Sequence, residues 1–252
     1  MKKYITLAAL LAAGTTFANA ETPTVVWDLD FESDGVAITA ADGVTTNLGD
    51  GVGSGLISDG AITLNNNSFS FTQTAGNLSY ANEFSLVVTV ALGATQPGSW
   101  PAIFGLGESN IWCWKPSFYV DSGNFKLDKD GFSGVVDETY KGVGDIGYTL
   151  PEEGYGDRVT ISLVSNGAGK ISLYVGGAEA GYTTITSASE YGSNKLIKNF
   201  TFGARNDGGN KSNIKLYDAT FYSGIVVPEP SAFGMLAGLG ALALVASRRR
   251  RK

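Results

Sequence analysis

The chain has 252 residues, of which 43% are hydrophobic, and it contains 34 glycines, one cysteine and no histidine. The absence of histidine excludes Ser-His-Asp and Cys-His catalytic triads. Together with the single cysteine, it also excludes the common zinc sites and an intramolecular disulfide. Catalysis by carboxylates and binding of calcium through oxygen ligands stay open.

The first 20 residues have the pattern of a secretory signal peptide. Lys2 and Lys3 form a basic start, an apolar stretch covers residues 5–13, and Ala18-Asn19-Ala20 is a small-residue cleavage site. The apolar stretch is too short to span a bilayer. We therefore expect export of the protein, with a mature chain that begins at Glu21.

The segment from residue 21 to residue 227 is 207 residues long, enough for one β domain with a sizeable core. Of the 18 Lys and Arg residues, two precede this segment and five follow it, which leaves 11; 23 of the 24 Asp and Glu residues lie inside it. Its formal charge is therefore −12. That balance argues against nucleic acid and anionic lipid surfaces as partners.

Short stretches in which apolar and polar residues alternate predict β-strands throughout this segment. The predicted strands cover residues 25–31, 61–64, 69–72, 84–92, 103–106, 118–120, 125–127, 159–163, 171–175, 200–202 and 214–222. Residues 33–60 are rich in Gly and Asp, so we expect long connecting loops there. Many short strands with little helix predict an all-β fold, an antiparallel β-sandwich in one domain.

Three places carry more specific expectations. The first strand is expected to bury one face, made of Val25, Trp27, Leu29 and Phe31. Strand 84–92 is apolar on one face and partly apolar on the other, which predicts a central position in a sheet. Strands 159–163 and 171–175 flank the turn Ser165–Gly169, whose Asn-Gly pair supplies the positive φ that a hairpin turn needs.

Three segments of the chain resemble the laminin-G-like, concanavalin A-like jelly roll. Residues 26–31 are similar to the opening strand of these domains, residues 158–177 to their central hairpin, and residues 200–222 to their closing pair of strands. In that pair the final strand returns beside the first. The resemblance implies a jelly-roll sandwich over residues 21–227 and a non-catalytic binding or adhesion module for glycans or proteins, sometimes through calcium. It assigns no functional residue, because the binding loops of the family vary most.

The C-terminal 25 residues combine three unlike elements. Pro228-Glu229-Pro230 forms a stiff turn, residues 232–246 are an uncharged apolar run nearly long enough for a transmembrane helix, and residues 248–252 are all basic. This order resembles the PEP-CTERM sorting signal of Gram-negative bacteria. The resemblance implies the export machinery, an inner-membrane intermediate, cleavage by an exosortase-type transpeptidase, and delivery to the cell surface or extracellular matrix. A permanent tail anchor is the alternative.

Aromatic residues supply the candidate ligand-binding site. The candidates are Trp112, Trp114, Trp100 and Tyr119. On a strand the two tryptophans that flank Cys113 share one face, where exposed indoles could stack on sugar rings or buried ones could fill the core. Tryptophans are usually buried, which favours the core, but Lys115 and Pro116 predict a strand end near the rim, which keeps the sugar platform as an alternative. Cys113 is expected to act as a small buried hydrophobic residue.

Acidic loops supply the candidate metal site. The candidate ligands for calcium are Asp128, Asp130 and Asp207. The first two fail the EF-hand pattern, and Asp207 has Asn206 and Asn210 as oxygen-bearing neighbours. Ordinary turns are the alternative, because Asp, Asn and Gly bend the backbone without any metal. No other cofactor is expected.

No catalytic residue is expected in this sequence. The carboxylate pairs Asp137-Glu138 and Glu152-Glu153 are adjacent in sequence and are expected in solvated loops, and the Glu-x-Asp-x-Glu stretch of related sandwich glycosidases is missing. We therefore expect a binding or adhesion module, with glycan as the leading ligand. A structural matrix protein without a small ligand and a diverged polysaccharide hydrolase are the alternatives.

Overall fold

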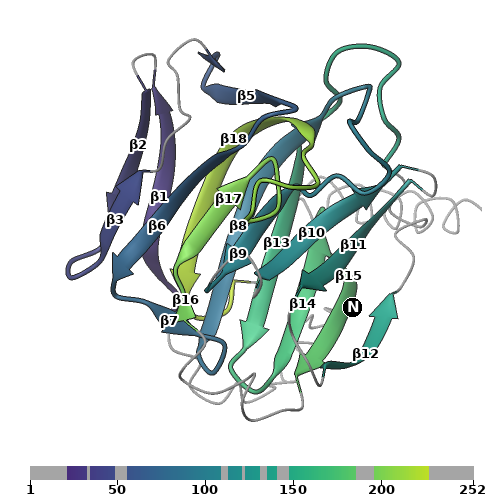
Figure 1. Ribbon diagram of the computed structural model, residues 1–252. Helices are drawn as coiled ribbons and strands as arrows, with labels where there is room; N and C mark the ends of the chain where they lie inside the picture. Colours follow the sequence, from purple (N-terminus) through teal and green to yellow (C-terminus); the bar gives the residue numbers. More distant parts are fainter. Residues whose placement is uncertain are drawn as a thin grey trace, which may run out of the picture.

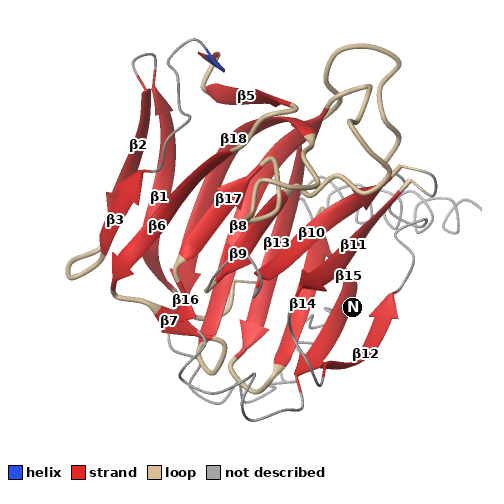
Figure 2. Ribbon diagram, viewed as in Figure 1, coloured by secondary structure: helices blue, strands red, loops and turns tan. Residues whose placement is uncertain are grey.

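The computed structural model describes residues 22–32, 35–48, 56–108, 113–120, 123–130, 135–140, 148–185 and 196–226. Over these residues the chain is all β, with two large antiparallel sheets stacked face to face (Figures 1 and 2). The predicted all-β sandwich is thereby confirmed. The signal segment 1–20 and the tail 228–252 lie outside the described residues.

The larger sheet contains ten strands. Its order is β12 (Val135–Tyr140), β15 (Ala178–Ile185), β14 (Lys170–Val175), β13 (Val159–Asn166), β8 (Glu83–Leu92), β18 (Asn213–Ser223), β1 (Thr24–Glu32) and β2 (Gly35–Ala40), with β5 (Ala61–Asn65) also paired to β18 and β4 (Ile57–Ser58) to β5.

The smaller sheet contains six strands and lies in front of the larger one in Figure 1. Its order is β11 (Asn124–Asp130), β10 (Cys113–Tyr119), β9 (Phe104–Gly107), β17 (Asn199–Phe202), β6 (Phe69–Ala75) and β3 (Thr45–Leu48). A separate short pair joins β7 (Leu78–Ser79) to β16 (Leu196–Ile197).

Strand β8 is central in the larger sheet, as its sequence predicts, because β13 and β18 pair with its two edges. The five apolar residues of its predicted core face are fully buried: Phe84, Leu86, Val88, Val90 and Leu92. The opposite face is also covered in part, since Ala91 is buried. A strand that is enclosed on both faces tolerates the nearly continuous apolar sequence found here.

The predicted hairpin is confirmed in strands β13 and β14. Asn166 closes the turn, because its side-chain oxygen accepts hydrogen bonds from the backbone N–H groups of Ala168 and Lys170, each at 2.9 Å. Gly167 and Gly169 have positive φ values, which glycine adopts without steric cost. The turn chemistry therefore sets the register between the two strands.

The last strand returns beside the first, as expected, since β18 pairs with β1 from Thr24↔Ser223 onward. The expectation for Val25 is wrong. A register shift between Val25 and Trp27 breaks the alternation of β1, so that Val25 is 45% exposed whereas Val26 and Trp27 are both buried. A β-bulge places two consecutive residues of one strand against a single partner residue, and the side-chain pattern shifts there.

The expectation of long loops across residues 33–60 is wrong for much of that stretch, which contains β2, β3 and β4. Strand β2 pairs with β1 along six consecutive positions, and its residues Val36, Ile38 and Ala40 pack against the core. Backbone hydrogen bonds do not depend on side-chain composition. The alternation of Val36, Ile38 and Ala40 is short and lies in a stretch rich in Gly and Asp, so the overall composition concealed the strand.

One aromatic group joins the two sheets at the centre of the core. The Trp27 ring of β1 contacts Phe71 of β6 and Phe200 of β17 edge-to-face, with centroid distances of 4.8 and 4.9 Å. It also stacks on Phe221 of β18 at 5.7 Å. Trp27 therefore lies on the larger sheet, and two of the three ring contacts described here are made with residues of the smaller sheet.

We expect Trp27→Ala to lower the free energy of unfolding by about 3–5 kcal/mol, because it removes a buried ring and leaves a cavity between the sheets. Val25→Ala, two positions away, is the matched control. It should change the free energy of unfolding by less than about 0.5 kcal/mol, since Val25 is exposed. Urea unfolding followed by circular dichroism measures both values. Equal losses in the two variants would contradict the bulge and the burial that it produces.

Candidate ligand-binding cleft

Four loops meet at one end of the sandwich, where several of the long tan loops in Figure 2 gather. Their backbones are joined by hydrogen bonds: Ala94 N–H donates to the Gly154 carbonyl at 2.9 Å, and Ala102 N–H donates to the Asn210 carbonyl at 2.7 Å. Between them lies a cleft of about 540 Å³. The cleft is lined by Asn66, Pro97, Gly98, Ser99, Trp100, Pro101, Gly208, Asn210 and Lys211.

Trp100 is the one aromatic residue among the described residues that line this cleft, and 57% of its surface is exposed. Its neighbours fix the backbone, because Phe118 N–H donates to the Pro101 carbonyl and Val120 N–H donates to the Ser99 carbonyl. These two hydrogen bonds, together with the bridge between Ala102 and Ser117, place Trp100 directly across from Tyr119. Directly opposed positions of antiparallel strands are close neighbours.

The structure thus brings two of the four aromatic candidates together at the level of the backbone. Trp114 lies five residues earlier on β10, opposite Leu106 of β9. Trp112 is outside the described residues, and so are the side chains of Cys113, Trp114 and Tyr119. Only Trp100 therefore has a side chain that the structure assigns to the cleft.

The expected strand end at Lys115 and Pro116 is wrong, because β10 continues to Tyr119. Pro116 fits inside this strand since its carbonyl, its one backbone hydrogen-bonding group, accepts from Ile103 N–H at 2.8 Å. Lys115 is buried. The rim is formed instead by the segment before β9, which includes Trp100.

The side chains of Asn213 and Gln96 form a clamp that fixes one wall of the cleft through hydrogen bonds to backbone groups. Asn213, at the start of β18, accepts from Asn66 N–H at 2.7 Å and donates to the Thr95 carbonyl at 2.8 Å. Gln96 donates to the Gly93 and Asn213 carbonyls at 3.0 Å each, and its own carbonyl oxygen accepts from Asn213 N–H at 3.0 Å. The side-chain amide groups of Asn213 and Gln96 therefore all have hydrogen-bond partners. The loop that carries Trp100 is held in place before any ligand binds.

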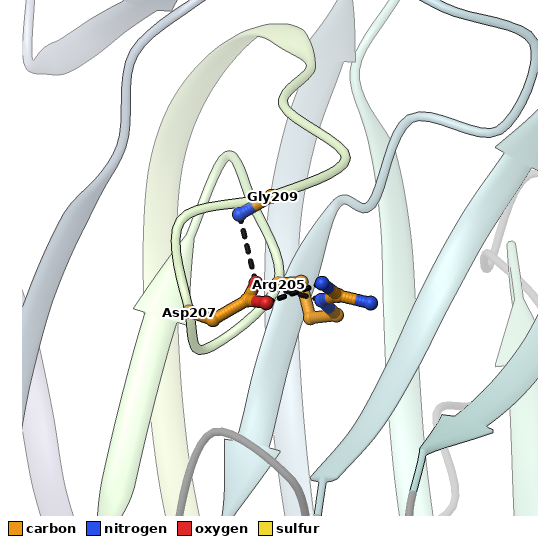
Figure 3. A network of polar contacts seen from close by, with 3 residues as sticks. All are labelled: Arg205, Asp207 and Gly209. Atoms are coloured by element: carbon orange, nitrogen blue, oxygen red, sulfur yellow. Dashed lines mark hydrogen bonds and ion pairs between the residues drawn. The ribbon is translucent and has the colours of Figure 1, made fainter.

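The opposite wall is a tight loop between β17 and β18, closed by an ion pair (Figure 3). Both carboxylate oxygens of Asp207 accept from the Arg205 guanidinium, and one of them also accepts from Gly209 N–H at 2.8 Å. The hydrogen bonds from Arg205 lower the pKa of Asp207, and the one from Gly209 adds to the effect. Asp207 is therefore a charged residue that stabilises the loop over the whole neutral range.

The hydrogen bonds of Asp207 reduce the support for it as a calcium ligand. Asp207 uses its carboxylate within its own loop, and among the described residues no group of three or more acidic or sulfur ligands is placed to hold a metal. Asp128 and Asp130 lie on β11, opposite Lys115 and Cys113. Their side chains are outside the described part of the chain. The calcium hypothesis stays a prediction.

The carboxylate pairs lie in two different places. Asp137 and Glu138 lie within edge strand β12, so the expectation of a loop there is wrong; pairing with β15 converts the stretch into a strand. Glu152 and Glu153 are exposed in a loop, as expected. They line a second hollow of about 380 Å³ with Tyr155, whose pKa is raised by burial.

Sequence reasoning did not single out Gln96, Asn213 or Lys211. The clamp joins residues 117 positions apart, and such a pair has no local pattern. The one signal in the sequence is the sharp loop Pro97–Pro101, which presents a tryptophan between two prolines and a glycine.

The tail and the fold match known proteins separately. Residues 226–251 match the PEP-CTERM protein-sorting motif, which indicates a secreted protein sorted to the cell surface or extracellular matrix. No curated protein matches the sequence. In the part that the structure describes, no helix is long and apolar enough to cross a membrane.

Several solved structures share the sandwich fold. The botulinum neurotoxin serotype D binding domain matches with 15% identity and a TM-score of 0.50, over 81% of this chain and 49% of that chain. The ligand binding domain of the same serotype in complex with N-acetylneuraminic acid matches with 12% identity and a TM-score of 0.50, over 80% and 48%. Trypanosoma rangeli sialidase matches with 12% identity and a TM-score of 0.49, over 80% and 31%.

The chain spans about half the length of the neurotoxin domains and less than a third of the sialidase. At these identities the neurotoxin matches show a common fold. They support the β-sandwich architecture, and they leave the residues of the cleft to be interpreted from their own geometry.

Two glycines of the loop between β17 and β18 test how tightly the cleft is built. Gly203 and Gly208 both have φ +78°, but a Cβ on Gly203 would lie 2.7 Å from the Asn67 carbonyl oxygen, whereas one on Gly208 meets nothing within 4 Å. We expect Gly208→Ala to cost about 1 kcal/mol of unfolding free energy from backbone strain alone. Gly203→Ala should cost about 3 kcal/mol, because overpacking is added to that strain. Urea denaturation distinguishes the two, and equal costs would contradict the close packing at Gly203.

Proposed function

We propose that this protein is an exported, non-catalytic β-sandwich that binds glycan in the cleft beside Trp100 and is sorted to the cell surface or extracellular matrix. The proposed division is a signal peptide over residues 1–20, a jelly-roll domain of the laminin-G-like or concanavalin A-like type over 21–227, and a sorting tail over 228–252. The neurotoxin domains support the sandwich part of this proposal through their fold.

The observation that carries the proposal is the exposed indole of Trp100 in a cleft of polar and small residues. An exposed tryptophan forgoes the stabilisation that burial would give it, and the C–H face of a sugar ring is a suitable partner for its surface. Asn66, Ser99 and Asn210 surround it with hydrogen-bonding groups for hydroxyls. Tyr119 is proposed as the second aromatic of the platform because its backbone position is opposite Trp100.

The competing functions receive less support from the cleft. A hydrolase needs two carboxyl groups on either side of one glycosidic bond. No Asp or Glu is among the described residues that line the cleft, and Glu152 and Glu153 belong to the other hollow. The exposed tryptophan on a clamped loop supports a binding role more than a purely structural one.

We expect Trp100→Ala to weaken glycan binding at least ~30-fold, or about 2 kcal/mol, because the stacking surface is lost. Trp100→Phe should retain most of the affinity. Neither change should alter the urea midpoint, since the side chain is largely exposed. Glycan-array binding with calcium and with a chelator measures both the affinity and any metal dependence. A wild-type protein that binds no glycan in either condition would contradict the proposal and favour a structural matrix role.

The sorting tail makes a separate prediction. In cells that express the sorting machinery, the mature protein should begin at Glu21 and end near Pro230, because the tail is removed by the transpeptidase. A variant with Ala at positions 228, 229 and 230 should keep the tail to Lys252. Intact-mass measurement of the protein from the cell surface or medium distinguishes the two forms. A wild-type protein that retains Lys252 would replace the sorting proposal with a permanent anchor.

A further inference from the structure

We infer that the ligand of the cleft is an acidic glycan, a saccharide that carries a carboxylate, and that Lys211 recognises its charge. This inference rests on the glycan-binding function proposed above and names the ligand class of the same site. It starts from an imbalance between the charge of the whole domain and the charge of the cleft.

The segment from residue 21 to residue 227 has a formal charge of −12, yet the cleft has the opposite sign. Lys211 is the one charged residue among the described residues that line it. Asp207 is the nearest acidic residue in the sequence, and its charge is balanced by the two hydrogen-bonded contacts from Arg205 (Figure 3). The local charge that a ligand meets is therefore positive, although the long-range field of the domain is negative.

The position of Lys211 is fixed by the backbone on both sides. The carbonyl of Asn210 accepts from Ala102 N–H, and Ser212 N–H donates to the Gly203 carbonyl at 2.8 Å. Asn210 has the positive φ value of 48°, a conformation that few residues adopt and that asparagine tolerates. The loop thus presents the lysine from the wall of the cleft, on the same lining as Trp100.

The neighbouring hollow limits where an acidic chain can run. Glu152 and Glu153 line that hollow together with Asn65 and Asn213. The Asn213 clamp, which accepts from Asn66 of the cleft, separates the two spaces. A carboxylate is therefore attracted on the Lys211 side of the clamp and repelled on the glutamate side, which orients an acidic ligand along the rim.

The composition of the cleft favours a carboxylate sugar over a phosphate or sulfate ester. Arginine forks are the usual partners of densely charged anions, and no arginine is among the described lining residues. One ammonium, two asparagine amides and one serine hydroxyl match a monoanion surrounded by hydroxyl groups. The indole of Trp100 supplies the stacking surface for the ring that bears it.

The test compares polygalacturonate with its carboxyl-reduced, neutral derivative, using the mature protein in low salt. The acidic polymer should bind about tenfold more tightly, since hydrogen bonds to charged groups are the stronger ones. Lys211→Gln should abolish the preference, so that this variant binds the acidic and the neutral polymer with equal affinity. Lys211→Arg should retain the preference, and 0.5 M salt should reduce it in the wild type.

The second hollow supplies a control of opposite sign. Replacing Glu152 and Glu153 by Gln should raise acidic binding by up to about threefold in low salt, because exposed charges interact weakly. Loss of acidic binding in that double variant would overturn the orientation and the inference with it.

The outcomes separate the two levels of the proposal. If neither polymer binds and a broader glycan array is also negative, the glycan-binding function itself fails. If both polymers bind equally and Lys211→Gln changes neither, glycan binding stands and the inference of an acidic ligand fails. The urea midpoint of Lys211→Gln, expected to equal that of the wild type, excludes misfolding as the cause of a loss.

Discussion

The contact of Trp27 with rings from both sheets is the interaction on which the rest of the structure depends. Two of its ring neighbours come from the smaller sheet and one from the larger. Because β17 carries Phe200 and leads directly into the loop between β17 and β18, the same packing that closes the core also fixes the base of one cleft wall. The other wall depends on β18, whose Phe221 stacks on Trp27 and whose first residue is the clamp Asn213.

The parts of the fold that sequence reasoning predicted are those in which side-chain alternation and backbone geometry agree. Strand β8 and the β13–β14 hairpin are of this kind, because long runs of period two and an Asn-Gly turn leave few alternatives. The bulge at Val25 and strand β2 were not predicted. In the first, one extra residue shifts the pattern; in the second, a short alternation of apolar residues lies within a stretch whose Gly and Asp content predicted loops.

The cleft likewise contains one residue that the sequence predicted and others that it did not. Trp100 was a candidate because it is an aromatic residue close in sequence to the pair Trp112 and Trp114, but the residues that hold it were not found. Gln96 and Asn213 are distant in sequence and ordinary in composition. They become a clamp only after the sandwich brings the end of β8 beside the start of β18. Local sequence patterns can therefore indicate a ligand-contacting side chain such as Trp100. They do not indicate the distant side chains that hold its loop in place.

Strand β18 also relates the cleft to the end of the described chain. It begins at Asn213 beside the cleft and ends at Ser223, opposite Thr24 of the first strand. Eleven extended residues span roughly 36 Å, so the cleft lies at one end of the strand and the last described residues, which follow Ser223, lie at the other. The proposed glycan site is therefore separated by the full length of β18 from the end of the described chain.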